Sequence, residues 1–347
     1  MGLGKLTKAA RFHKIAQPLA IEQVERPTIS EEEVLLRTRE AGICHTDLHL
    51  IDTGMMLNPP VTLGHEIAGV VEEVGSSVFN FKKGDRAVVH FWNPCGSCHY
   101  CLKGEEMLCL KLFARPSYGI SCDGGYAEYC SVDPKRLVLV PENVPLDFAA
   151  TLGCAGLTAL HAIQNTGRNL EGASVVIYGL GGLGLYAIQF AKHLQMHVIA
   201  VGRSQEKLRL AEVLGADVVI NASTEAVSSG VKAATRNRGA DAIFSFVPFM
   251  DLEVLRNSLT ALANGGRVVL VGLTSTLSVD LTPFIFRGFS LQGSFAGSKK
   301  ELATVLDLAS KERITSIVRK KMKLEEINEG LQSLKRGEVL GRCVVAP

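Results

Sequence analysis

A glycine-rich turn between a short apolar run and a helix-like segment constrains the fold of this chain more than any other feature. The run Val175–Tyr178 leads directly into the sequence Gly-Leu-Gly-Gly-Leu-Gly at 179–184. In such a turn the first glycine permits a tight bend, the second lets backbone approach a pyrophosphate, and the third lets helix and strand pack closely. The helix expected over Leu185–Leu194 then presents free N–H groups and a partial positive charge to phosphates. The motif therefore predicts a dinucleotide site that includes Gly179, Gly181, Gly182 and Gly184.

Strand and helix patterns alternate after this turn. Helical stretches such as Gln205–Leu214 and Leu252–Ala263 separate short apolar segments. This alternation predicts a parallel sheet with right-handed crossovers, the doubly wound Rossmann plan of an α/β protein. A glycine-rich turn in an unrelated α/β protein is the alternative, and the strands that follow the turn argue against it. The expected strands are Ser174–Tyr178, His197–Val201, Val218–Ile220, Ala242–Phe246 and Arg267–Val271.

The residues before this region have a different pattern. Glu33–Thr38, Ile67–Val74 and Arg86–Phe91 are typical of short strands set between turns. A chain of 347 residues exceeds one ordinary core, so two domains are expected. A helix over Lys300–Ser310 and short mixed elements close the chain. We therefore expect a β-rich catalytic domain formed by residues 1–152 and 295–347, interrupted by a dinucleotide-binding domain at 153–294.

The charge balance argues against several classes of partner. The 37 basic and 35 acidic side chains leave a net charge of +2, which gives no electrostatic case for nucleic acid or a membrane surface. No apolar run reaches the roughly 20 residues that a membrane-spanning helix needs. The N-terminal segment lacks the apolar core of a secretory signal. We therefore expect a cytoplasmic enzyme that acts on a small molecule.

The end of the second strand bears on which dinucleotide is bound. An NAD site usually places an acidic residue there, where it accepts a hydrogen bond from the ribose 2′-OH. Here the strand ends in Gly202-Arg203-Ser204, so no carboxylate repels a 2′-phosphate and two side chains can donate to one. The sequence therefore predicts NADP(H) over NAD(H). In the alternative interpretation Arg203 is a solvated turn residue and either cofactor is used.

Four cysteines lie within one short loop. In a chain without an export signal, clustered thiols more often bind metal than form disulfides. Four thiolates complete a tetrahedral zinc and leave no place for substrate, so the loop predicts a structural zinc. An iron–sulfur cluster is the alternative, but the spacing departs from the ferredoxin pattern. The four are Cys95, Cys98, Cys101 and Cys109.

A second group of candidate ligands is spread along the chain, and consists of Cys44, His65 and Cys154. Two thiolates and one imidazole leave a fourth tetrahedral position open, as a Lewis-acid site for an alcohol oxygen requires. A zinc ion there would stabilise an alkoxide, which more readily gives up hydride to a nicotinamide. A lone cysteine or histidine is usually a core or surface residue, so spacing alone does not establish this trio.

Taken together, these motifs resemble those of the zinc-dependent medium-chain alcohol dehydrogenases over essentially the whole chain. The resemblance is carried by Gly64-His65-Glu66-x2-Gly69-x5-Gly75-x2-Val78, by Gly84-Asp85, by the four-cysteine loop and by the dinucleotide turn. It implies a chaperonin-10-like β-rich catalytic domain together with a Rossmann domain. It also implies two zinc ions per subunit, one structural and one catalytic, the latter held by Cys44, His65 and Cys154.

The resemblance implies further roles around the catalytic zinc. Glu66 would lie next to the metal as an occasional ligand, and Asp47 would orient His65 by accepting its other N–H. Thr46 would hydrogen-bond the substrate oxygen and pass its proton toward His49, which would exchange it with solvent. Otherwise Thr46 is a turn-stabilising hydroxyl and His49 an exposed helix residue.

The same resemblance implies contacts to the dinucleotide. It places His45 and Arg342 near the pyrophosphate and Lys207 beside the adenosine. Backbone around Val271 and Leu273 would face the nicotinamide carboxamide. Each basic residue is otherwise a solvated surface charge.

The expected activity is hydride transfer between a primary or secondary alcohol, or the corresponding aldehyde or ketone, and NADP(H). A polyol or sugar dehydrogenase of the same superfamily is one alternative, although those relatives commonly use a carboxylate in place of Cys154. A zinc-free enoyl or quinone reductase would not need the three ligands. A non-catalytic zinc-binding interaction module is the remaining alternative. Relatives of this length commonly form homotetramers, so a tetramer, or else a dimer, is expected.

Overall fold

The structure is a computed structural model, and it describes residues 5–247, 252–272 and 278–347. The chain divides into two compact units. Unit 1 comprises Met1–Leu157 and Gly297–Pro347, and unit 2 comprises Thr158–Ala296. The limits fall after residues 157 and 296, whereas the sequence-based limits fall after residues 152 and 294. The helical segment Leu146–Gln164 is continuous across the first limit, so local pattern alone marks no break there.

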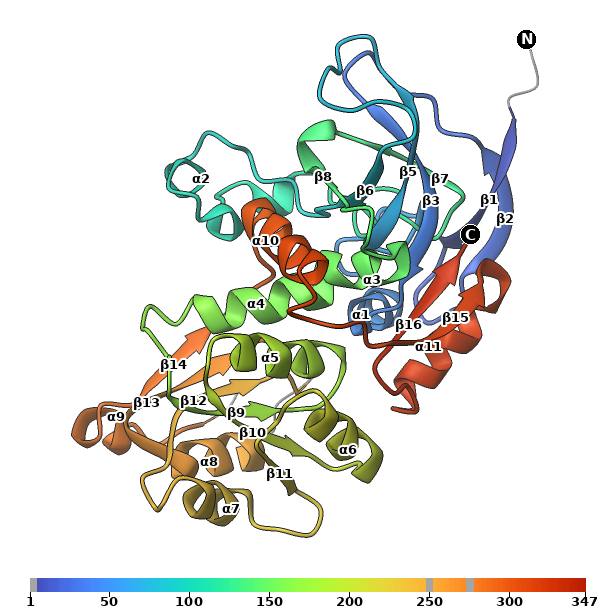
Figure 1. The fold of residues 1–347 in the computed structure, drawn as a ribbon. Helices are drawn as coiled ribbons and strands as arrows, with labels where there is room; N and C mark the ends of the chain where they lie inside the picture. The colour runs from blue at the N-terminus through green and yellow to red at the C-terminus, as the bar shows by residue number, and fades with distance from the viewer. Residues whose placement is uncertain (1–4, 248–251, 273–277) are drawn as a thin grey trace. The chain divides into compact units, whose positions relative to one another are not determined.

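Unit 2 is built on a six-stranded parallel sheet. Its strands are β9 (Ser174–Tyr178), β10 (His197–Gly202), β11 (Val218–Asn221), β12 (Ala240–Ser245), β13 (Leu262–Leu270) and β14 (Ser290–Gly293). Its helices are α5 (Gly182–His193), α6 (Gln205–Val213), α7 (Val227–Ala234), α8 (Leu252–Ala261) and α9 (Thr282–Phe286). The strand order is β11-β10-β9-β12-β13-β14, so the order reverses between β9 and β12. Helices α5 and α6 cover one face and α7 and α8 the other (Figure 1), which confirms the doubly wound plan.

The central strands of this sheet are apolar because both of their faces are covered. Val175, Val176 and Ile177 of β9 are fully buried, as expected of a strand inside a doubly wound sheet. The edge strand β14 was not predicted, because its sequence Ser-Leu-Gln-Gly holds a single apolar residue. Strand β14 is therefore formed by its pairing with β13 rather than by its own pattern.

Unit 1 contains two sheets, mostly antiparallel. The strands are β1 (Leu6–Phe12), β2 (Ala20–Glu25), β3 (Val34–Gly42), β4 (Val61–Thr62), β5 (Glu66–Val74), β6 (Arg86–Val89), β7 (Tyr129–Val132), β8 (Leu137–Leu139), β15 (Val318–Lys323) and β16 (Arg342–Ala346). One sheet has the order β2-β1-β4, and the other has the order β15-β16-β3-β5-β6-β8 with β7 also paired to β3. In the larger sheet Gly42 pairs with both Glu66 and Val344. This register brings the ends of β3, β5 and β16 together.

Unit 1 also contains helices. They are α1 (His45–Thr53), α2 (His99–Leu102), α3 (Leu146–Thr151), α10 (Lys299–Ser310) and α11 (Ile327–Lys335), and a π-helical stretch over Leu152–Gly156 leads into α4 (Leu157–Gln164). The continuous segment Leu146–Gln164 is long and apolar enough to meet the criteria for a membrane span, with a mean hydropathy of 1.4. However, 83% of its most apolar window is buried inside the protein, which is the behaviour of a core helix.

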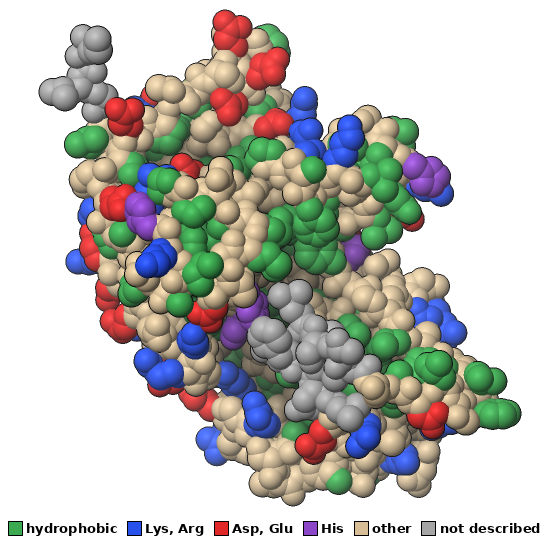
Figure 2. Space-filling view, turned by 180° about the vertical axis from the view of Figure 1, so that it is seen from behind, with side chains coloured by type: hydrophobic (Ala, Val, Ile, Leu, Met, Phe, Trp, Pro, Cys, Tyr) green, Lys and Arg blue, Asp and Glu red, His purple; other side chains and the backbone are tan. Residues whose placement is uncertain are grey.

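The surface carries charges of both signs. Figure 2 shows basic and acidic side chains interspersed over one face of the molecule. This distribution is consistent with the net charge of +2.

Candidate metal centres and dinucleotide site

Four buried side chains of unit 1 converge on one point. Candidate ligand atoms of Cys44, His65, Glu66 and Cys154, here called the Cys44 cluster, all lie within 4.8 Å of one another. Cys44 is the residue that caps the N-terminus of α1, and Glu66 begins β5 directly after His65. Cys154 lies in the π-helical stretch. The structure therefore brings together the three predicted ligands that the sequence separates widely, with Glu66 beside them.

The π-helical stretch is a local departure from the helix expected near Leu152–Ile163. It spans Leu152–Gly156, and its five residues are all buried. A π-turn widens the helix by one residue and is common at functional sites. The sequence predicted a helix at this position, but not the wider turn that carries Cys154.

Asp47 organises the imidazole of this cluster. Its Oδ1 lies 3.3 Å from His65 Nδ1, and its Oδ2 accepts a hydrogen bond of 3.0 Å from the backbone N–H of Cys44. The other imidazole nitrogen, His65 Nε2, is buried and has no hydrogen-bond partner among the residues that the structure describes. A buried nitrogen left in this way among thiols is suited to a metal ion.

The electrostatics of the cluster favour a thiolate. A hydrogen bond from the Cys154 thiol holds the pKa of Cys44 well below its usual value, although burial opposes this effect. The same hydrogen bond, with burial, raises the pKa of Cys154 well above its usual value. Burial alone would lower the pKa of His65, but the Asp47 carboxylate and Cys44 raise it well above its usual value. A stabilised thiolate is the form of cysteine that binds metal.

Glu66 and Arg342 form a buried ion pair beside the cluster. Glu66 is fully buried and Arg342 is 4% exposed, so Arg342 is not a solvated surface charge. Burial raises the pKa of Glu66 to about 8, with the Arg342 guanidinium opposing the rise. Room for the carboxylate comes from Gly42, where a Cβ would lie 1.9 Å from Glu66 Oε2. Sequence reasoning placed Arg342 near the pyrophosphate and did not foresee this pairing.

The donor set of the cluster fits zinc. Two thiol sulfurs, one imidazole nitrogen and a carboxylate oxygen are ligand types that zinc accepts, and hard-cation sites use oxygen alone. The three sulfur and nitrogen donors leave one tetrahedral position for substrate or for Glu66.

The loop with four cysteines forms a second, separate group. Candidate ligand atoms of Cys95, Cys98, Cys101 and Cys109 also lie within 4.8 Å of one another. Backbone N–H groups donate to two of the sulfurs, from Cys98 to Cys95 at 3.3 Å and from Lys111 to Cys109 at 3.4 Å. Hydrogen bonds from backbone N–H groups lower the pKa of Cys95 to about 5. The arrangement fits a closed tetrahedral site.

Little apolar burial supports this loop. Leu102 and Leu108 within the loop are 76% and 59% exposed, Leu110 just after it is 74% exposed, and Met107 is the buried apolar side chain of the loop. Side chains that remain in water contribute little to folding. A metal held by the four thiolates would therefore add a restraint where apolar burial is sparse.

The dinucleotide turn has the geometry that its glycines predict. Gly179 has a φ of +98°, and a Cβ on Gly184 would lie 2.0 Å from the Gly179 carbonyl oxygen. Helix α5 begins at Gly182, with Gly181 as its N-terminal cap. The turn lies at the carboxyl end of β9, next to the point where the strand order reverses.

The residues after β10 are open to solvent. Arg203 and Ser204 are exposed, and the Ser204 side chain caps α6 by accepting from the backbone N–H of Lys207. Lys207 is half-buried, and burial lowers its pKa. Val271 donates its N–H to Ser245 at 3.1 Å. Leu273 lies outside the described residues.

The proposed proton relay residues lie at the start of α1. The Cys44 thiol lies 3.6 Å from Thr46 Oγ1, which is half-buried. His49 is half-buried on the same helix, and His45 is exposed at its first position. Thr46 is thus adjacent to the Cys44 cluster, whereas His49 lies one turn further along the helix.

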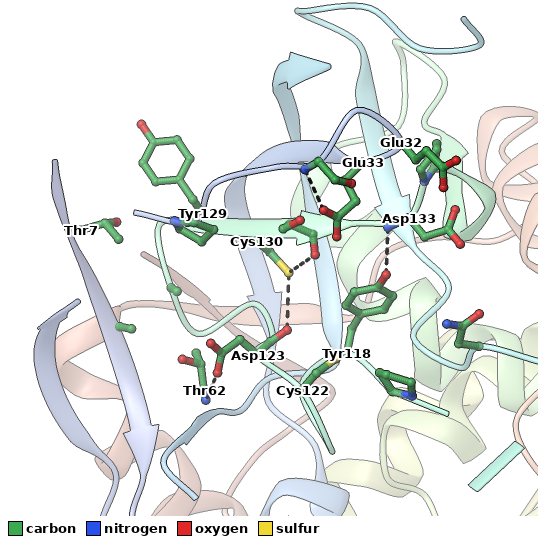
Figure 3. A pocket seen from close by; sticks show the side chains of 18 of the residues that line it. Thr7, Glu32, Glu33, Thr62, Tyr118, Cys122, Asp123, Tyr129, Cys130 and Asp133 are labelled. Atoms are coloured by element: carbon green, nitrogen blue, oxygen red, sulfur yellow. Dashed lines mark hydrogen bonds between the residues drawn. The ribbon is translucent and has the colours of Figure 1, made fainter. Parts of the chain in front are cut away.

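Unit 1 also holds a cavity away from these groups. Its volume is about 1080 Å³, and its lining includes Tyr118, Cys122, Asp123 and Cys130. Figure 3 shows the backbone N–H of Asp133 bonded to the Tyr118 hydroxyl there, at 2.8 Å. None of the metal-cluster residues lines this cavity.

The chain is similar in sequence and in fold to known dehydrogenases. Residues 30–142 match the family described as alcohol dehydrogenase GroES-like domain, and residues 182–311 match the family described as zinc-binding dehydrogenase. An alcohol dehydrogenase of Geobacillus stearothermophilus is 36% identical over 342 residues, covering 97% of this chain and 99% of that protein. An NAD-dependent alcohol dehydrogenase of Sulfurisphaera tokodaii is 35% identical over 358 residues, covering 98% of this chain and 100% of that protein. The crystal structure of the Aeropyrum pernix alcohol dehydrogenase has a TM-score of 0.90 and 36% identity, covering 98% of this chain and all of that one.

A GroES-like unit with two cysteine-containing clusters and a doubly wound unit together define a zinc-binding dehydrogenase. The matches along nearly the whole chain narrow this class: the chain belongs to the zinc-dependent medium-chain alcohol dehydrogenase family. The predicted fold class and enzyme class are thereby confirmed.

Proposed function

We propose that this alcohol dehydrogenase transfers a hydride between a primary or secondary alcohol, or the corresponding aldehyde or ketone, and NADP(H), with zinc at the Cys44 cluster. The observation that carries the proposal is that buried candidate ligand atoms of Cys44, His65, Glu66 and Cys154 lie within 4.8 Å of one another. When bound there, zinc supplies a Lewis acid for the alcohol or carbonyl oxygen.

The surrounding residues would prepare this site for substrate. Cys44, His65 and Cys154 would hold the metal, and Asp47 would fix the imidazole through Nδ1. Glu66, held by Arg342, would be close enough to exchange with substrate at the open position. Thr46 Oγ1 would hydrogen-bond the substrate oxygen and pass its proton toward His49.

The preference for NADP(H) is supported by the residues that come directly after β10. Position 202 is glycine, and Arg203 and Ser204 are exposed where a 2′-phosphate would be bound. Since a carboxylate is lacking there, a 2′-phosphate meets no repulsion and finds an Arg and a hydroxyl as donors. The relative from Sulfurisphaera tokodaii is named NAD-dependent, so the proposed preference differs from the cofactor in that name.

The test combines metal analysis with steady-state kinetics. Wild-type protein is expected to hold two zinc ions per chain and to show a higher kcat/KM with NADP⁺ than with NAD⁺ across small alcohols. Cys44→Ala is expected to lose one zinc and to lower kcat/KM by on the order of a thousandfold, because several kcal/mol of Lewis-acid stabilisation disappear. Cys122→Ala, in neither cluster, is the matched control and is expected to keep both metals and full turnover. Undiminished turnover by Cys44→Ala would contradict the metal role, and a higher kcat/KM with NAD⁺ would contradict the cofactor preference alone.

A further inference from the structure

Tyr126 is a fully buried residue that no part of the proposed reaction uses. Its side chain is 0% exposed, and its backbone is tied on both sides. Its N–H donates to Leu63 at 3.0 Å, and its carbonyl accepts from Ala10 at 2.7 Å. The backbone of Tyr126, from which the ring extends, is therefore held in place by two neighbouring segments of the chain.

The ring of Tyr126 packs against the turn that carries a metal ligand. Gly64, which directly precedes His65, has a φ of +90°, and a Cβ on it would lie 2.5 Å from Tyr126 Cδ1. The left-handed backbone and the ring both require glycine at this position. The ring thus restrains the position of the backbone that leads into His65.

The hydroxyl of Tyr126 reaches the carboxylate that holds the imidazole. It donates to Asp47 Oδ2 at 2.7 Å, and the Gly42 carbonyl oxygen lies 3.1 Å away. Burial, reinforced by Asp47, raises the pKa of Tyr126 well above its usual value, so the hydroxyl keeps the proton it donates. A charge-assisted hydrogen bond of this length is among the stronger ones in proteins.

We propose that Tyr126 is a positioning residue for the catalytic metal: its hydroxyl holds the Asp47 carboxylate so that Asp47 directs His65 Nε2 at the ion. Hydrogen bonds connect the Tyr126 hydroxyl to the imidazole through Asp47. The Asp47 Oδ2 atom accepts from the Tyr126 hydroxyl and from the Cys44 backbone N–H, while Oδ1 faces His65 Nδ1. The inference rests on the proposed function, since it requires a metal at the Cys44 cluster.

The physical reason is the burial of Asp47. Asp47 is fully buried, so water cannot replace a lost donor. Without the hydroxyl, Oδ2 keeps only the Cys44 N–H, so rotation of the carboxylate about its Cβ–Cγ bond is less restrained. The imidazole then loses its fixed orientation, and loss of such outer partners typically weakens metal binding 10–100-fold.

The experiment compares Tyr126→Phe with the full-length wild-type enzyme. The substitution removes one oxygen and keeps the ring against Gly64. We expect zinc release from the Cys44 cluster to a chromogenic chelator to be about tenfold faster, the low end of the range for lost outer partners. We also expect the visible spectrum of cobalt(II) at this site to shift, because the imidazole geometry changes.

The matched control is Tyr118→Phe, which removes a hydroxyl that contacts Asp133 in the cavity of Figure 3 instead of Asp47. It is expected to release zinc at the wild-type rate.

A second substitution separates positioning from general loosening of the fold. In an Asp47→Asn background, Tyr126→Phe is expected to add little to the rate of zinc release, because both act through one carboxylate. Equal effects in both backgrounds, or an unchanged cobalt spectrum in Tyr126→Phe, would overturn the inference. If wild-type protein and Cys44→Ala hold the same amount of zinc, the proposed function itself fails, which is a distinct outcome.

Discussion

At the scale of single residues, the site depends on side chains whose hydrogen bonds and charges complete one another. Asp47 receives three donors, and Glu66 is balanced by Arg342. Removing one partner of such a buried set leaves the other partner unpaired. The loss in folding free energy is then larger than the free energy that the hydrogen bond itself contributed. Arg203 is exposed, so we expect its loss to weaken binding of a charged ligand rather than to destabilise the fold.

Arg203→Ala therefore tests the cofactor preference without disturbing the fold. We expect kcat/KM for NADP⁺ to fall by about 10–100-fold, because a charge-assisted hydrogen bond contributes about 1.5–3 kcal/mol. The value for NAD⁺, which lacks the 2′-phosphate, is expected to stay nearly constant. Arg256→Ala removes another exposed arginine, on α8, and serves as the control. An equal loss with both cofactors would contradict a contact with the 2′-phosphate.

At the scale of elements, specific contacts add to apolar burial at one loop and at one strand end. The four-cysteine loop exposes its leucines, and Asp217 ties the start of β11 to neighbouring elements of unit 2. Each of these elements should therefore respond sharply to loss of one ligand or one charge.

Cys98→Ser removes one ligand of the four-cysteine loop. We expect the protein to lose about one zinc per chain, because three thiolates no longer close the tetrahedron. The loop should become sensitive to proteases and the Tm should fall, while cobalt still binds at the Cys44 cluster. Limited proteolysis and metal analysis measure these effects. Full zinc content in Cys98→Ser would show that the loop holds no structural zinc.

Asp217 gives unit 2 a predictable response to acid. Burial alone would raise the pKa of Asp217, but hydrogen bonds from Lys192 and from the Val198 backbone N–H lower it below its usual value. A carboxyl group with a lowered pKa stabilises the fold above its ordinary pKa of about 4, and that contribution is lost as the pH falls through the lowered value.

Asp217→Asn is therefore expected to lower the Tm by a few degrees at neutral pH, and by progressively less as the pH falls below about 4. Thermal unfolding followed from neutral to acidic pH measures the difference. Asp307→Asn on α10, which breaks an exposed ion pair with Lys311 just after that helix, is the control and should change the Tm very little. A constant difference at every pH would contradict the linkage.

At the scale of the whole molecule, the candidate metal ligands belong to unit 1 and the dinucleotide turn to unit 2. Dinucleotide binding can therefore be measured apart from turnover. At about 100 times its Kd a ligand stabilises the form that binds it by about 2.7 kcal/mol. We expect NADP⁺ to raise the unfolding temperature by a few degrees, and NAD⁺ at the same concentration to raise it less. The shift should persist in Cys44→Ala, since that residue lies in the other unit. A larger shift with NAD⁺ would contradict the preference.

Much of this molecule could be predicted from its sequence because the relevant signals are local. Strand β9 was predicted with its observed bounds, and most of the other predicted strands differ from those observed by a few residues at their ends. Alternating apolar runs, glycines in tight turns and closely spaced thiols act over a few residues, where steric limits and hydrogen bonding decide the outcome. The four-cysteine loop and the dinucleotide turn belong to this class.

The tertiary structure alone decided which distant residues meet. Gly42 pairs with both Glu66 and Val344, and this register places Arg342 against Glu66. Tyr126 lies 79 residues from Asp47 in sequence, yet it donates to that carboxylate. The wider π-turn at Cys154 likewise follows no local pattern. These contacts depend on sheet register and on the packing of buried side chains, which are set by the whole core and leave no short-range signature in the chain.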